Sequence, residues 1–401
     1  MSKSNETTPN VPTLRFKRYT TEWTKINLSN YLCVSSKRNK DGRFSKEDVL
    51  SVSGELGIVN QIALLGRSYA GESVLPYHIV EKGDIVYTKS PLALYPYGII
   101  KTNRNKVGIV STLYAVYKTK DNANNRFIEH YFSLKSRINN YLKPIVRIGA
   151  KHDMKIGNNE VLENIVAFPD ISEQCEIADF LDLLDNRISV QNKIISDLKV
   201  LKKELCNRYF KSVHNDTSLE YVTLKDILTE RKEYCSKDGT YTHGTLSKEG
   251  VSPKTERYDR DFLVKNENKQ YKVTHFNDIC YNPANLKFGV ICRNTYGDLI
   301  FSPIYVTFEI ADTVYPAYIE LFLTNANFIG RIRRYEQGTV YERMAVSSED
   351  FLSYETRMPT YEEQVKFADK IQRIQDKIEL ETLFLNYLQK QRKYLLNAMF
   401  I

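Results

Sequence analysis

The sequence predicts an α+β fold in which two similar mixed α/β domains are separated by a long antiparallel two-helix coiled coil. Residues 169–210 and 359–400 align without a gap at a constant shift of 190, so that Gln174 falls on Gln364. Both segments carry apolar residues at alternating steps of four and three, the spacing of a heptad seam. The segments before them repeat too, at slightly drifting shifts, as loop insertions would produce. The internal duplication therefore predicts pseudo-twofold symmetry.

The chain divides into four parts. They are a first domain at 1–168, a first long helix with its linker at 169–215, a second domain at 216–358 and a second long helix at 359–401. In the first domain, residues 77–87 alternate apolar and polar side chains around Lys82-Gly83-Asp84, which predicts a half-buried β-hairpin. Residues 128–142 are expected to be helical and to end before Pro144.

The first long helix is expected to begin after Pro169, where a missing N–H costs little. Ser172 is a candidate N-cap, and Glu173 and Glu176 follow where the helix dipole favours acidic residues. A polar stretch at 212–218 then acts as a linker. About 38 uninterrupted helical residues would form a rod on the order of 57 Å long.

The second domain repeats the first in outline. Residues 77–87 match residues 271–281 at a shift of 194, and Gly98 falls on Gly289 at a shift of 191. A helix is expected at 317–335. The two domains are therefore predicted to share one framework.

Each long helix carries a predicted coiled-coil seam of apolar residues. The seam consists of Leu181, Leu184, Ile188, Ile195, Leu198 and Leu205 in the first helix, and Ile371, Ile374, Ile378, Leu385, Leu388 and Leu395 in the second. Charged residues outside it, such as Asp182 and Asp185, are expected to be solvated. Six further residues, Ile194, Leu201, Tyr209, Phe384, Tyr387 and Tyr394, widen the apolar stripe and favour an additional partner.

Charge is unevenly distributed along the chain. Residues 1–168 carry 25 Lys and Arg against 14 Asp and Glu, whereas residues 216–358 carry 18 against 21. A basic first domain suits a polyanion such as DNA. A nucleic-acid role for the second domain would have to use local basic patches.

Composition and motifs exclude several classes of protein. The chain has no apolar run near 18 residues and no secretory leader, so we expect no membrane span. The six cysteines are scattered without a Cys-x-x-Cys pair, as expected of a cytoplasmic protein. The histidines show no metal spacing, and no phosphate-binding or dinucleotide loop is present, so neither a catalytic residue nor a metal or cofactor site is predicted.

The chain resembles the specificity (S) subunits of type I restriction–modification systems. The motifs that carry the resemblance are Pro169-Asp-Ile-Ser-Glu-Gln174 and Pro359-Thr-Tyr-Glu-Glu-Gln364, which open the two helices, together with Leu184-Asp-Asn-Arg-Ile188. The resemblance implies a DNA-binding subunit that is not itself an enzyme. Each domain would be a target-recognition domain that reads one half of a bipartite site in double-stranded DNA, and the helix pair would set the spacer.

The resemblance also implies partners. The helix pair would dock two modification subunits, which carry S-adenosylmethionine and methylate adenine, and restriction subunits would join that complex. Two alternative functions are open. A self-contained restriction or modification enzyme would need a cofactor loop and a catalytic motif, and neither is found. A non-DNA-binding coiled-coil structural adaptor would account for the helices alone.

Candidate DNA-binding residues are basic or polar side chains that could reach phosphates or base edges. In the first domain they are Lys37, Arg38, Lys40, Arg67, Lys89, Lys101, Arg104, Lys106 and Lys151. In the second they are Lys248, Lys254, Lys287, Arg293, Tyr341 and Arg343.

Overall fold

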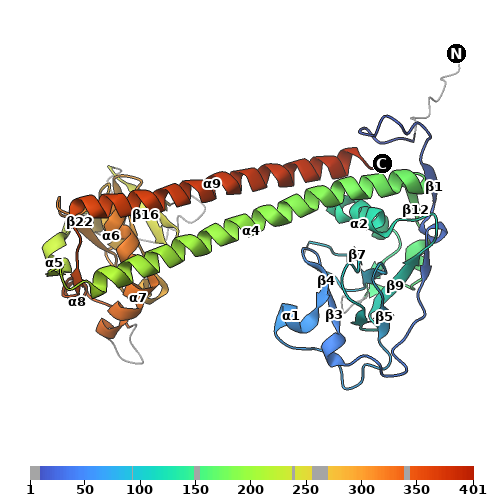
Figure 1. Cartoon of the computed structure of the whole chain (residues 1–401), viewed down its shortest axis with the longest axis horizontal. Helices are drawn as coiled ribbons and strands as arrows, with labels where there is room; N and C mark the ends of the chain where they lie inside the picture. The colour runs from blue at the N-terminus through green and yellow to red at the C-terminus, as the bar shows by residue number, and fades with distance from the viewer. Residues whose placement is uncertain (1–9, 93, 149–153, 237–239, 255–269, 338–343) are drawn as a thin grey trace, which may run out of the picture. The chain divides into compact units, whose positions relative to one another are not determined.

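The computed structural model describes residues 10–92, 94–148, 154–236, 240–254, 270–337 and 344–401, and every structural statement below concerns these residues. The chain forms two compact units (Figure 1). The first unit comprises Met1–Asn192 and Leu383–Ile401, and the second comprises Lys193–Thr382. Each unit therefore holds one β-rich domain and a part of each long helix, α4 (Ile171–Asn215) and α9 (Tyr361–Ala398).

The first domain is built on a four-stranded antiparallel sheet. Its strand order is β2 (Leu32–Val34), β9 (Tyr114–Thr119), β6 (Ile85–Thr88) and β7 (Ile100–Thr102). Helices α2 (Asn125–Ser133) and α3 (Lys135–Leu142) cover one face of this sheet. A hairpin of β3 (Leu50–Ser53) and β4 (Gly57–Asn60) covers the other.

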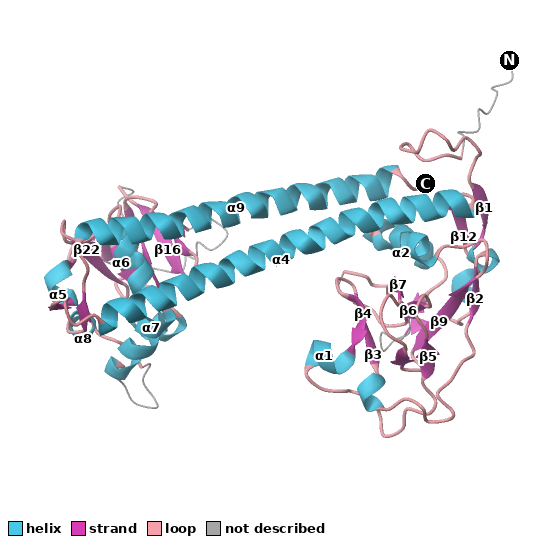
Figure 2. Ribbon diagram, viewed as in Figure 1, coloured by secondary structure: helices cyan, strands magenta, loops and turns pink. Residues whose placement is uncertain are grey.

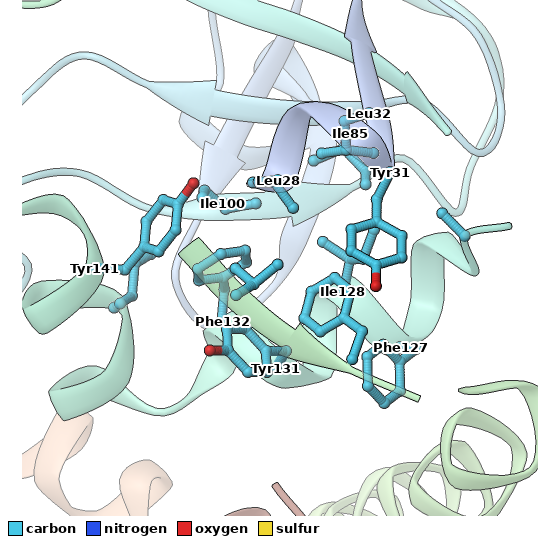
Figure 3. Packing of buried hydrophobic residues seen from close by; sticks show 14 of the residues in the cluster. Leu28, Tyr31, Leu32, Ile85, Ile100, Phe127, Ile128, Tyr131, Phe132 and Tyr141 are labelled. Carbon is cyan, nitrogen blue, oxygen red and sulfur yellow. The ribbon is translucent and has the colours of Figure 1, made fainter. Parts of the chain in front are cut away.

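Successive residues of β6 point into two different cores. Ile85 packs with Phe127 in the large core under the helices, part of which Figure 3 shows. Val86 packs with Ile58 of the hairpin on the opposite face. This alternation follows from the two-residue period of a strand. Each fully buried side chain of this size contributes roughly 1.5–3 kcal/mol, so both layers hold the sheet in place.

The hairpin predicted at residues 77–87 is wrong. The segment forms two strands, but β5 (His78–Val80) pairs with β8 (Gly108–Val110), while β6 pairs with β7 and β9. All four residues of β6 are buried, because both faces of its sheet are covered. The turn itself is present, and Gly83 adopts a φ of 95°, which glycine reaches without a steric penalty.

Two predicted helices are each divided in two. The helix expected at 128–142 is interrupted at Leu134, whose backbone is extended with a ψ of 118°. The helix expected at 317–335 instead begins as two α-helices, α6 (Pro316–Leu323) and α7 (Ala326–Ile332). Asn325 separates them: its ψ is 136°, and its side chain accepts a hydrogen bond from the backbone N–H of Asn327.

The second domain repeats the framework of the first. Its sheet order is β14 (Leu228–Glu230), β22 (Val306–Ile310), β19 (Ile279–Tyr281) and β20 (Ile291–Arg293). Helices α6 and α7 cover one face, and a hairpin of β16 (Thr242–Ser247) and β17 (Gly250–Pro253) covers the other. At the turn equivalent to Gly83, Asn277 has a φ of 73°, a conformation that Asn tolerates better than most residues.

Further short elements complete the two domains. In the first domain these are β1 (Thr24–Asn27), which pairs with β12 (Ile165–Phe168), together with α1 (Gln61–Leu65), β10 (Arg147–Ile148) and β11 (Met154–Lys155). In the second they are β13 (Tyr221–Thr223), which pairs with β23 (Glu355–Arg357), together with α5 (Leu224–Ile227), α8 (Ser348–Leu352), β15 (Tyr234–Cys235), β18 (Tyr271–Thr274) and β21 (Leu299–Phe301). β12 leads into α4 and β23 into α9, so each domain delivers its chain to a long helix from an equivalent strand pair.

Within the first unit, α4 and α9 pack antiparallel. The Arg392 guanidinium binds the Asp185 carboxylate, with Nη2 at 3.0 Å from Oδ2. Arg187 lies over the Phe384 ring at 5.1 Å. Figure 2 shows both helices as continuous ribbons.

Within the second unit the two helices also pack antiparallel, through repeat-equivalent positions. Lys202 Nζ donates to Gln375 Oε1 at 2.9 Å. A shift of 190 converts Asp185 into Gln375 and Lys202 into Arg392, so this contact is the duplicate of the Asp185–Arg392 pair in the first unit. The predicted α+β fold with two β-rich domains and a pair of long packed helices is therefore confirmed.

The predicted seam residues lie along the packed side of both helices. All twelve are buried or half-buried, with Leu181 and Ile371 each 1% exposed. Tyr209, predicted as an off-seam residue, instead stacks on Phe367 at 3.6 Å between ring centroids within the second unit. Of the other off-seam residues, Tyr387 and Tyr394 are 59% and 63% exposed.

Candidate nucleic-acid interface

Each domain presents a β-hairpin on the sheet face that its helices leave open. In the first domain, Leu50 and Ile58 fix the hairpin on the sheet. In the second, Leu246 and Val251 do the same against Phe301. Each hairpin is therefore held firmly against its sheet. The sequence analysis did not predict where these hairpins lie.

Four predicted DNA-binding residues of the first domain lie on two segments that pack together. Asn39 joins residues 36–49 to residues 66–77: its N–H donates to Tyr77 O at 3.0 Å, and its Nδ2 donates to Val74 O at 3.3 Å. This places Lys37, Arg38 and Lys40 on one segment and Arg67 on its neighbour. Of these four, Lys37, Lys40 and Arg67 are exposed and Arg38 is half-buried.

An ion pair connects Lys37 to Glu81, the residue that follows β5. Lys37 Nζ lies 2.7 Å from Glu81 Oε1, and hydrogen bonds from Lys118 and Lys37 lower the pKa of Glu81 to about 2. Arg38 donates to Pro76 O at 2.8 Å. Exposed ion pairs of this kind contribute little to stability, so Lys37 can exchange its partner for a phosphate at small cost.

Arg43 and Lys46 were missed, although they continue the same basic run. Both side chains are exposed. Arg43 lies over the Phe44 ring at 4.6 Å. The sequence interval of three residues between Lys37, Lys40, Arg43 and Lys46 was the available indication, but an irregular segment offers no period that would show which residues share a face.

Lys106 lies beside the first hairpin. It is exposed on the loop between β7 and β8. The neighbouring Asn105 donates from Nδ2 to Ile58 O on β4 at 2.8 Å, which holds the loop against the hairpin.

Lys89 and Lys101 have partners inside the first unit. Lys89 Nζ donates to Ile156 O at 2.9 Å and to Asn158 Oδ1 at 2.6 Å, and burial lowers its pKa. Lys101 Nζ lies 3.9 Å from Glu129 Oε1, and burial lowers its pKa as well. Contact of either amine with DNA would require these partners to be given up, and their role remains a prediction.

Arg104 belongs to an ion network that attaches the first domain to α4. Its guanidinium binds Glu129 of α2 at 2.8 Å and Asp182 of α4 at 2.7 Å. Arg126 and His130 each place a nitrogen 2.9 Å from the same Asp182 carboxylate. Burial alone would raise the pKa of Asp182, but hydrogen bonds from His130 and Arg104 outweigh it, so the pKa is lowered.

The expectation that Asp182 and Asp185 are solvated is wrong. The Asp182 side chain is 15% exposed and bound by three cationic or imidazole groups, and Asp185 binds Arg392. The partners are 52 to 207 residues away in sequence, so helical periodicity could not reveal them.

The second domain carries three of its predicted residues on exposed or half-exposed positions. Lys248 lies in the turn of the β16–β17 hairpin, and Lys254 directly follows β17. Lys287 places its amine 5.4 Å from the ring of Phe288, which is 57% exposed. The hairpin thus carries one exposed lysine at its turn and one directly after its second strand.

Arg293 has partners inside the second domain. It binds Glu320 of α6 at 3.0 Å and Asn277 at 2.8 Å. Glu320 is the repeat-equivalent of Glu129 at a shift of 191, so a link from the edge strand to the helix is present in both domains. The remaining predicted residues, Lys151, Tyr341 and Arg343, lie outside the described residues.

No helix among the described residues has the length and apolar character needed to cross a membrane. No group of three or more His, Cys, Asp or Glu side chains in the same part of the chain is placed to hold a metal ion.

Both a protein-family model and solved structures are similar to this chain. Residues 76–200 match the family of the type I restriction modification DNA specificity domain. The S subunit of a type I restriction–modification system from M. genitalium has a similar structure, with a TM-score of 0.57 and 13% identity over 98% of this chain and 99% of that one. A structure described for complex assembly and conformational transition of a type I system matches with a TM-score of 0.54 and 13% identity, over 94% of this chain and 96% of that one. No curated protein matches by sequence.

The chain thus has the fold of type I restriction–modification S subunits, and its residues 76–200 match the DNA specificity domain of such systems.

Proposed function

We propose that the two β-rich domains, assigned to residues 1–168 and 216–358, are target-recognition domains that each read one half of a bipartite DNA site. The helices at 169–215 and 359–401 would hold the domains apart and set the length of the unspecified spacer. The duplicated framework carries this proposal, because two copies of one sheet, one covering hairpin and one helix entry suit two equivalent reading tasks.

The outer hairpin of each domain, with its neighbouring segments, is the surface that we propose faces DNA. In the first domain Lys106 lies beside the hairpin, and Lys37 and Lys40 lie on the segment that leads into it. In the second domain Lys248 lies in the turn of the hairpin and Lys254 directly follows it. Amines on exposed segments can bind phosphates, which supply most of the salt-dependent affinity. Selection between bases would come from polar side chains on the same elements.

We also propose that the long helices dock modification subunits. In the first unit Leu183, Val190, Tyr387 and Tyr394 are each between 59% and 69% exposed on helices whose seam is already filled. Apolar side chains exposed in this number on a helix pair are typical of an interface. S-adenosylmethionine would be held by the modification subunits, and restriction subunits would complete the assembly.

Mapping methylated adenines across the host genome tests this function. The expected result is a two-part motif with a spacer of one fixed length, and loss of that methylation when this chain is deleted. A single uninterrupted motif, or methylation that persists after deletion, would overturn the proposal.

A further inference from the structure

The first turns of both long helices contain a buried glutamine that contacts the adjoining domain. Gln174 is 0% exposed and Gln364 is 1% exposed. The neighbouring residues on the same side of each helix are apolar, among them Ile177 and Phe367. A buried amide costs free energy unless it is hydrogen-bonded, so its presence at both equivalent positions calls for a physical reason.

In the first unit the Gln174 amide joins the start of α4 to residues 122–124. Its Nε2 donates to Pro169 O at 2.8 Å and to Asn122 O at 3.1 Å. Its Oε1 accepts the backbone N–H of Asn124 at 3.0 Å. Asn124 is the N-cap residue of α2, so one side chain connects the start of α4 to the start of the domain's first covering helix.

In the second unit Gln364 makes the equivalent contacts. Its Nε2 donates to Pro359 O at 2.9 Å, and its Oε1 accepts the backbone N–H of Tyr315 at 2.9 Å. Tyr315 is the N-cap residue of α6, the counterpart of α2. The proline carbonyl, the glutamine and the capped helix therefore recur together in both copies.

We propose that Gln174 and Gln364 are positioning residues that set the angle between each domain and its long helix, and so determine how strictly the subunit measures the DNA spacer. Apolar contacts at these joints are non-directional, whereas hydrogen bonds weaken steeply when their angles change. An amide bonded on both sides therefore fixes a direction that packing alone leaves free to vary. This inference rests on the proposed spacer function.

The required precision can be estimated from helix geometry. About 20 residues of helix span about 30 Å. A change of about 10° at one end of such a helix displaces its other end by about 5 Å, more than the 3.4 Å rise of a base pair. A small loss of angular definition at either joint is thus enough to admit DNA with a spacer one base pair too long or too short.

The test uses the full chain in complex with its modification subunits, and duplexes that keep both half-sites but carry the native spacer or one base pair more or less. The variants are Gln174→Met and Gln364→Met, which keep the side-chain length but remove both hydrogen-bonding groups. Gln389→Met, at an exposed position of α9, is the matched control. The readout is the ratio of affinity for the native spacer to affinity for the altered spacers.

We expect each joint variant to reduce this ratio by about ten-fold, the scale of one or two lost hydrogen bonds, while the control leaves it unchanged. Equal weakening on all duplexes, with the ratio preserved, would mean a purely structural role and would overturn the inference. A wild-type ratio near one would instead overturn the spacer function itself. If a Met variant does not assemble, Gln174→Asn, which keeps the amide but shortens the side chain by one methylene, is tested in the same way and should also reduce the ratio; an unchanged ratio would overturn the inference.

Discussion

At the scale of single residues, basic side chains of this protein fall into two groups that the sequence does not distinguish. Lys89, Lys101 and Arg293 have partners inside their own domains. Lys40 and Lys248 are exposed, Lys40 on the segment that leads into the first hairpin and Lys248 in the turn of the second. Residue type does not separate the two groups, whereas contacts between distant segments do.

Exposed lysines near the hairpins should contribute to DNA affinity through phosphates. We expect Lys40→Ala and Lys248→Ala each to weaken binding of the assembled complex to all duplexes, and to reduce the slope of log affinity against log salt by about 0.9. Titration at several salt concentrations measures the slope. Lys25→Ala, an exposed lysine of β1 that was not proposed to bind DNA, should leave it unchanged; a loss of equal size there would count against the interface.

Asp182 should be important for the stability of the first unit. We expect Asp182→Asn to destabilise this unit by about 3 kcal/mol at neutral pH, because it leaves Arg104, Arg126 and His130 without their shared carboxylate. Trp23, the only tryptophan of the chain and 2% exposed in the core of the first unit, reports the transition by its fluorescence in denaturant. Asp121→Asn, an exposed carboxylate of the same domain, is the control.

The pH dependence of this effect has a defined sign. The folded-state pKa of Asp182 is depressed, so its stabilising contribution is complete above its unfolded pKa of about 3.9 and is lost as pH falls further. The difference between wild type and Asp182→Asn should therefore be largest at neutral pH and shrink below about pH 4. A difference that grows on acidification would contradict the assigned network.

At the scale of elements, the long helices were predictable because their signals are local and periodic. The heptad spacing, the opening prolines and the absence of later breakers are all read along one segment, and the predicted seam residues lie on the packed side. The β-rich domains were predicted only in outline. Strand pairing and the break at Leu134 depend on contacts with distant segments, so residues 77–87 were given the wrong partner.

The candidate interface was partly predictable for the same reason. The run of basic residues from Lys37 to Lys40 is visible in the sequence, but the hairpin beside which Lys106 lies is positioned by packing against the sheet. The repeated Pro-to-Gln motif was visible as well, yet its function depends on the partners Asn124 and Tyr315, each about 50 residues away.

The helix seam should separate buried from exposed leucines within two turns of α9. Leu388 is 3% exposed and Leu383 is 51% exposed, and both belong to the first unit. We expect Leu388→Ala to cost about 2–5 kcal/mol by leaving a cavity, and Leu383→Ala to change stability by no more than about 0.5 kcal/mol. Denaturation followed by Trp23 fluorescence measures both; similar costs for the two leucines would argue against the seam.

At the scale of the whole molecule, duplication gives one chain two copies of a domain, a joint and a helix. Equivalent joints are kept at Gln174 and Gln364, while other contacts between domain and helix are shared only in part. An aromatic contact recurs, because Phe400 packs on Phe127 in the first unit and its repeat-equivalent Phe210 packs on Tyr318 in the second. The first unit adds the Asp182 ion network. Domains can diverge in what they read as long as the joints that orient them are preserved.

The central proposal is that the two domains read DNA at a separation fixed by the paired helices. The most direct measurement is the methylation rate of the assembled complex on a series of duplexes that share both half-sites and differ by one base pair at a time in the spacer. The account predicts one preferred spacer, with the rate falling at least about ten-fold when it is changed by one base pair, as expected where a single contact of about 1.4 kcal/mol is lost. Equal rates across the series, or full activity on a duplex with one half-site, would contradict it.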